Sequence, residues 1–155
     1  MSVRRSAVPD GSLIARYKGQ GNHVDAYVAS TQRAVDLSTN IAAFFSTPVF
    51  RAERVFLGLG GKHSSDAQVA DLAAGRGENI AAWKVEERSP NELLLEATGT
   101  PIRTWLAVEP DGTALWFGSV VLAEKGRVPL LARVMMPGHA LYSRILLAAA
   151  LRQVS

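Results

Sequence analysis

The spacing of apolar residues changes near residue 80 of the chain. The chain begins with a short segment in which apolar and polar residues loosely alternate. From there to residue 80 the apolar residues recur every three or four positions, as on one face of a helix. Beyond it, apolar and polar residues alternate, which is typical of half-buried strands. Helical spacing then returns at the end. The pattern predicts one strand, two or three helices, four strands and a long terminal helix.

The first strand is predicted at residues 24–31, where Val, Tyr and Thr occur together. A helix follows, for which Ser38 or Thr39 is the expected N-cap. Pro48 interrupts this helix and is expected at the first position of a second one, because proline has no N–H to lose there. Glycines at 58–61 end the second helix.

A short third helix is predicted from a cap at Ser64 or Ser65 to a stop at Gly75. The loop before it, residues 58–65, superficially resembles a phosphate-binding loop. It lacks the first glycine and the final hydroxyl residue of that motif, which are replaced by Phe56 and His63. We therefore interpret it as a connection between helices.

The alternating region contains strong turn signals. Pro90 and Asn91 favour one turn, and the sequence Pro-Asp-Gly at 110–112 favours a hairpin. Gly118 is a possible β-bulge. Strands that follow one another through tight turns form an antiparallel meander. The predicted strands cover residues 83–88, 93–98, 102–109 and 113–122.

The terminal helix is apolar almost all the way round, with Leu147 and Leu151 extending the apolar stripe. Such a helix is expected to be largely covered. Pro137 and Gly138 predict a kink or a start, which places His139 in the first turn. His139 then has two interpretations: a structural tie at the start of the helix, or a polar group of a pocket.

Together these elements predict an α+β fold, with an antiparallel sheet covered by helices. We expect an N-terminal arm at residues 1–22 and a single domain at 23–155. A sheet that curls around the last helix is the helix-grip arrangement, which tends to leave a cavity between the two.

Three segments resemble the domain-of-unknown-function family 2867. These are the opening "HVDAYVAS", the stretch "WKVEERSPNELLLEATG" and the ending "PGHALYSRILLAAAL". The resemblance extends over about residues 23–153. It implies membership of the START and polyketide-cyclase-like superfamily, with a helix-grip fold and an apolar ligand cavity. It implies no settled activity.

The chain departs from this family after the Leu-rich strand. The family often has a His-Leu-Asp-aromatic-Arg stretch there, whereas this chain has "TPIRTWLAV", with Arg103 near the position of the missing His and Asp. Chemistry that requires that His or Asp is therefore not expected here.

The net charge of +3 is distributed unevenly. Residues 125–155 carry five basic side chains and no acidic one, whereas the rest of the chain sums to −2. A basic end suits nucleic acid, an anionic membrane surface or an anionic ligand. Here the charges stand singly among apolar residues, so we predict solvated arginines on a mostly buried helix and no nucleic-acid partner.

The sequence also limits the chemistry. The chain has no cysteine, and its histidines, His23, His63 and His139, lack metal-site spacing, so neither a metal nor a cofactor is predicted. No serine occupies a nucleophile elbow. Arginine or glycine interrupts every apolar stretch before the roughly 20 residues of a membrane span. With no apolar signal segment, a cytoplasmic location is expected.

Aromatic residues beside small ones indicate a ligand pocket in the sheet. Such a wall, with a few polar groups to orient the ligand, is typical of binding sites. The alternative is a dry core in which helix side chains fill the gaps. The candidate ligand-binding residues are Arg103, Trp105, Trp116, Phe117, His139 and Tyr142.

The predicted function is binding of a small, mostly apolar molecule between the sheet and the terminal helix. One alternative is a cyclase or hydrolase of the same superfamily, with His139 or Tyr142 as acid or base. Another is a protein-interaction module that exposes its tryptophans and the basic end. An oligomer is compatible with each of these.

Overall fold

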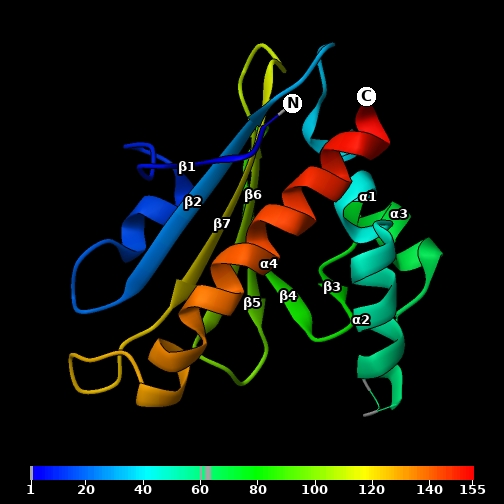
Figure 1. The fold of residues 1–155 in the computed structure, drawn as a ribbon. Helices are drawn as coiled ribbons and strands as arrows, with labels where there is room; N and C mark the ends of the chain where they lie inside the picture. Colours follow the sequence, from blue (N-terminus) through cyan, green and yellow to red (C-terminus); the bar gives the residue numbers. More distant parts are fainter. Residues whose placement is uncertain (1, 60, 62–63) are drawn as a thin grey trace.

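A curved antiparallel sheet organises the fold (Figure 1). The structure is a computed structural model and describes residues 2–59, 61 and 64–155. Within these residues the sheet has seven strands in the order β1-β2-β7-β6-β5-β4-β3. The strands are β1 (Arg4–Ser6), β2 (His23–Ser30), β3 (Asn79–Ile80), β4 (Trp83–Arg88), β5 (Glu92–Ala97), β6 (Ile102–Val108) and β7 (Ala114–Val121).

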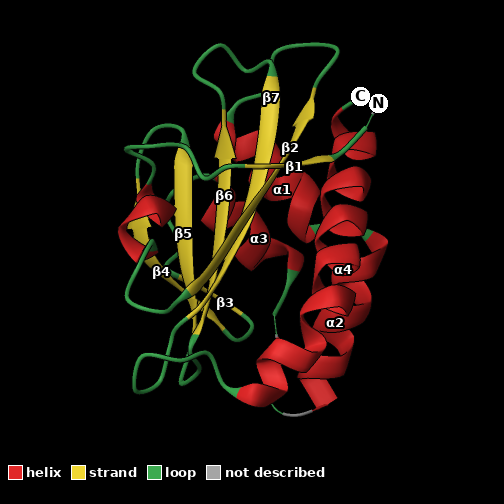
Figure 2. Cartoon of the chain, turned by 60° about the vertical axis from the view of Figure 1, so that its left-hand side comes forward, coloured by secondary structure: helices red, strands yellow, loops and turns green. Residues whose placement is uncertain are grey.

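The helices divide unequally between the two faces of the sheet (Figure 2). Helices α1 (Leu37–Phe45), α2 (Pro48–Leu59), α3 (Asp66–Ala73) and α4 (Leu130–Val154) lie on one side. The short 3₁₀ helix η1 (Leu13–Tyr17) covers the other face. The predicted α+β class is therefore confirmed, and a curved sheet with a long terminal helix is compatible with a helix grip.

The helix starts follow the capping chemistry, with one correction. The N-cap of α1 is Asp36 rather than Ser38 or Thr39, because its carboxylate accepts the backbone N–H of Thr39 (2.7 Å). Helix α2 begins at Pro48 as predicted. Ser65 caps α3 in a capping box with Gln68, one of the two residues expected there.

The predicted meander is confirmed within one or two residues at each strand. Its hairpin turn closes where Gly112 N–H donates to the carbonyl of Glu109 (2.8 Å). The sequence pattern did not indicate β1 or β3, which have only three and two residues. The bulge expected at Gly118 is absent, since β7 pairs without interruption on both sides. The register instead shifts between Val85 and Glu87 of β4.

Helix α4 differs most from its prediction. It begins at Leu130, so Pro137 lies inside it and His139 falls in the third turn rather than the first. No residue of α4 before Ser143 is buried, so the expectation of a largely covered helix is wrong for its first half. Proline has no N–H, so Pro137 leaves one carbonyl of the preceding turn without its helical hydrogen bond. Because this half of the helix is exposed to solvent, water can satisfy that carbonyl.

Gly118 is required by close packing on the η1 face. A Cβ there would lie 2.7 Å from Ile14 Cδ1, 2.8 Å from Trp105 Cε3 and 2.9 Å from the carbonyl oxygen of Asp25. The rigid indole and the strand backbone cannot move away easily. We therefore expect Gly118→Ala to lower the free energy of unfolding by about 1–3 kcal/mol in urea titrations.

Gly138→Ala is the matched control. A Cβ at Gly138 meets no atom within 4 Å, and the position is helical. Alanine there should raise the free energy of unfolding by about 0.5–1 kcal/mol. A Gly118→Ala protein as stable as the Gly138→Ala protein would contradict the packing argument.

Candidate ligand-binding groove

An open groove of about 730 Å³ lies between the first half of α4 and the adjoining end of the sheet. Its lining is mostly apolar. Leu131, Val134 and Met135 come from α4, and Ile102 and Val121 come from the ends of β6 and β7. The polar side chains that line it are His23, Ser119, His139 and Tyr142.

The groove exists because the two halves of α4 pack differently. The second half buries Leu146, Leu147 and Leu151 in the same core as α1 and α3. The first half has no helix between it and the sheet, and Leu131, Val134 and Met135 stay 72%, 69% and 62% exposed. Apolar side chains gathered this way in a concave surface mark a binding site more often than isolated exposed ones do.

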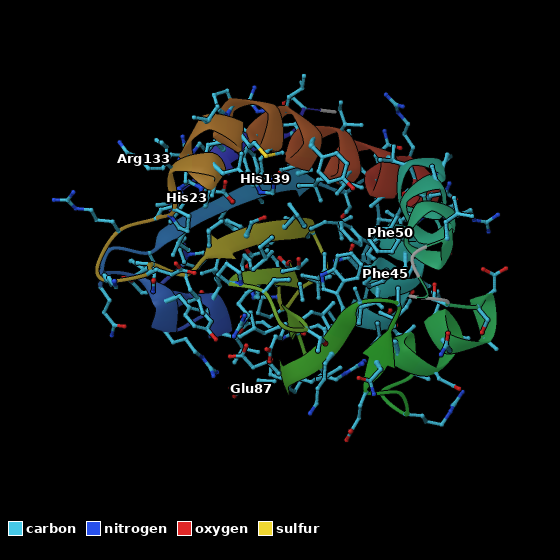
Figure 3. All side chains as sticks on the ribbon, turned by 90° about the horizontal axis from the view of Figure 1, so that it is seen from below. His23, Phe45, Phe50, Glu87, Arg133 and His139 are labelled. Atoms are coloured by element: carbon cyan, nitrogen blue, oxygen red, sulfur yellow. The ribbon has the colours of Figure 1, made fainter. Side chains whose placement is uncertain are left out.

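A cluster of aromatic rings fills the other end of the sheet. Phe44 stacks on Phe117 with ring centroids 5.4 Å apart, and Phe45 meets Phe50 edge to face at 4.6 Å. Figure 3 shows Phe45 and Phe50 at the end opposite His23 and Arg133. Phe117, a candidate ligand residue, therefore belongs to this packed core, which matches the dry-core alternative at this end.

Of the six candidates, His139 and Tyr142 line the groove. The hydroxyl of Ser143 donates to the carbonyl of His139 (2.9 Å) and lies 3.5 Å from His139 Nε2. Ser143 is buried, so these contacts keep the imidazole beside the helix backbone. Of the two interpretations of His139, the structure places it in the pocket rather than at the start of the helix.

Arg103, Trp105 and Trp116 lie on the opposite face of the sheet, so they do not line the space beneath α4. Residues alternate between faces along a strand, and on β6 the α4 face belongs to Leu106 and Val108. Alternation along the predicted strand 102–109 puts Arg103 and Trp105 on one face, but it does not say which of the two faces the helices cover.

The two tryptophans form a small second core with η1. Trp105 is 1% exposed, and its ring centroid lies 6.0 Å from that of Trp116. The indole N–H of Trp105 donates to Glu92 (2.8 Å), and the same carboxylate oxygen accepts the N–H of Leu13 (2.7 Å). The indole of Trp116 donates to Glu109 (2.8 Å). Because both indole N–H groups are satisfied within the protein, these side chains hold η1 in place.

Arg103 belongs to a polar network on this η1 face. Its Nε donates to Glu86 (2.7 Å), and its NH2 lies 3.8 Å from Glu96. The hydroxyl of Tyr17 donates to the other oxygen of Glu86. Figure 3 shows Glu87, the neighbour of Glu86, on the far side of the sheet from α4. The network therefore fastens η1 to β4 and β6.

The sequence reasoning missed a buried acid beneath the groove. Asp25 is 4% exposed, and its Oδ2 lies 3.2 Å from Nε2 of His23. No described residue hydrogen-bonds its Oδ1. A buried carboxylate needs a partner, and His23 supplies a positive one when the ring is doubly protonated. The available signal was the i, i+2 spacing at the start of the first strand, because it puts both side chains on one face once the strand begins at His23 rather than at the predicted residue 24.

No group of three or more potential metal ligands occurs among the described residues. His63, one of the three histidines considered for metal binding, lies outside the described residues.

Searches against protein-family models, curated proteins and solved structures give no significant match to this chain. The resemblance to family 2867 therefore stays a prediction from short motifs.

The Tyr17 network predicts a loss of stability at high pH. Burial, and next the hydrogen bond to Glu86, raise the pKa of Tyr17 above its ordinary value. The folded state thus holds this proton more tightly than the unfolded state. The contribution of protonated Tyr17 to the free energy of unfolding is complete below the pKa of about 10 that tyrosine has in the unfolded chain. This contribution is lost as pH rises through the higher pKa of the folded state.

We expect the free energy of unfolding to fall as pH rises above about 10, and to fall less in Tyr17→Phe, as measured by urea titration at each pH. Some fall should remain, because burial and the charge of Asp25 also raise the pKa of Tyr27. An equal fall in the wild type and in Tyr17→Phe would contradict the role given to Tyr17.

Proposed function

We propose that this protein binds a small, mostly apolar molecule in the groove between α4 and the sheet. The observation that carries the proposal is the uncovered apolar wall formed by Leu131, Val134 and Met135. The volume of about 730 Å³ lies within the range of roughly 300–1,000 Å³ typical of ligand pockets. Covering such side chains removes apolar surface from water, which is the main favourable contribution to binding.

The polar side chains of the groove stand where they can orient a ligand. His23 and Ser119 lie on the sheet side, and His139 and Tyr142 lie on the helix side. A ligand between them is apolar along most of its length and carries a hydrogen-bonding group. This arrangement agrees with the cavity that the resemblance to family 2867 implies, and that membership is part of the same proposal.

Two alternatives have less support. For a cyclase or hydrolase, the described side chain within hydrogen-bond reach of His139 Nε2 is the Ser143 hydroxyl rather than a carboxylate. For an interaction module that exposes its tryptophans, Trp105 is buried and Trp116 is half-buried. A cytoplasmic location stays a prediction.

The membrane expectation also stays a prediction. By length and composition alone, α4 could cross a membrane, the one such helix in the described part of the chain. Its second half packs into the core of this fold.

Gly138 offers a direct test of the groove. It lines the groove, and a side chain added there meets open space, so Gly138→Trp should occupy the binding volume without disturbing the fold. We expect this variant to bind the neutral probe Nile red at least about ten-fold more weakly than the wild type. The indole would remove apolar contact worth more than about 1.4 kcal/mol, which corresponds to that factor. The measurement is a fluorescence titration.

Gln153→Trp is the control, because Gln153 is exposed near the other end of α4 and outside the groove. It should bind the probe like the wild type. Equal binding by all three proteins, or no binding by the wild type together with no co-purifying molecule in native mass spectrometry, would remove the proposed function.

A further inference from the structure

A basic hollow adjoins the apolar groove at the start of α4. It has a volume of about 450 Å³ and shares His23 and Met136 with the groove. Arg127, from the loop after β7, and Arg133, from the second turn of α4, line it as well. Figure 3 shows His23 and Arg133 together at this end of the molecule. The apolar groove therefore opens onto positive charge.

The loops around this hollow are held in place by contacts of their own. The side chain of Asn22 accepts the N–H of Ala123 (2.8 Å) and donates to the carbonyl of Tyr17 (3.0 Å). A Cβ at Gly21 would overlap the carbonyl oxygen of Gly126, so the two loops touch through a residue that must be glycine. The backbone that carries Arg127 is thereby anchored to the loop before β2.

The two guanidinium groups have no side-chain hydrogen bond or ion pair with any described residue. In the sheet, Asp25 is buried and lies 3.2 Å from the ring of His23, which lines the hollow. In the loop, Glu124 stands beside Lys125, and their charges offset one another. Arg127 and Arg133 thus leave the hollow with a net positive charge.

We propose that the ligand is an amphiphile with an anionic head, a carboxylate or a phosphate on an alkyl chain. The chain lies along Leu131, Val134 and Met135, and the head lies in the hollow between Arg127 and Arg133. This inference rests on the proposed function and adds the chemistry of the ligand. Guanidinium groups recognise both kinds of head because their planar N–H donors match paired oxygen acceptors.

The charge also explains why the occupant is amphiphilic rather than wholly apolar. A neutral chain would fill the groove but would make no use of the positive charge of Arg127 and Arg133. An anionic head neutralises them, and the attraction operates in a partly exposed site, where salt screens it.

The test compares ligands that share a twelve-carbon chain. Dodecanoate, dodecyl phosphate and 1-dodecanol, below their micelle concentrations, would displace Nile red from the wild type, from Arg127→Ala/Arg133→Ala and from Arg152→Ala. Arg152 is the matched control, an exposed arginine of the same helix outside both hollows.

We expect at least one of the two anions to bind the wild type about ten-fold more tightly than the alcohol, a difference of about 1.4 kcal/mol. The double variant should lose most of this preference and keep its affinity for the alcohol, whereas Arg152→Ala should behave like the wild type. Raising the salt from about 0.05 M to about 0.5 M should reduce the preference without weakening binding of the alcohol. The anion that binds more tightly identifies the head.

The outcomes separate the two proposals. If the alcohol and both anions bind equally, or if the preference persists in the double variant, the head-group inference is overturned and the apolar groove stands. If none of the three displaces the probe, both proposals fail. If sedimentation shows a dimer that the groove-filling Gly138→Trp substitution dissociates, a second copy of the chain occupies the groove and both proposals fail as well.

Discussion

Unequal filling of the space between the sheet and α4 is the constraint on which the rest of this structure depends. At one end, Phe44 stacks on Phe117, and the second half of α4 buries Leu146 and Leu147 against the same core. At the other end no helix intervenes, and the strands present His23, Ser119 and Val121. The packed end holds the helix in place, and the other end keeps a groove beneath it.

The opposite face of the sheet has a different role, which is to lock the N-terminal segment. Glu92 accepts hydrogen bonds from both Trp105 and Leu13, so one carboxylate joins the sheet to η1. The ion pairs of Arg103 close the same face. On this face both indole N–H groups are satisfied within the protein and Arg103 is ion-paired, whereas the α4 face exposes apolar side chains together with Arg127 and Arg133.

The pair formed by half-buried His23 and buried Asp25 connects the fold to the proposed chemistry. It lies where the apolar groove meets the basic hollow, and it keeps a carboxylate beneath a site that otherwise favours anions. Because Asp25 is buried whereas Arg127 and Arg133 are exposed, the arginines are the charges that a ligand in the hollow contacts. The same end of α4 thus combines apolar contact, hydrogen bonding and positive potential.

The sequence by itself determined the α+β class, the meander, the position of Pro48 and the cap at Ser65, because period and capping are properties of adjacent residues. It also placed Trp105 and Arg103 on one face. Only the tertiary structure decided which face lies under α4, because strand alternation defines two faces without saying which helices cover each. The same limit applies to α4. Its apolar composition predicted burial, but among the described residues none buries its first half.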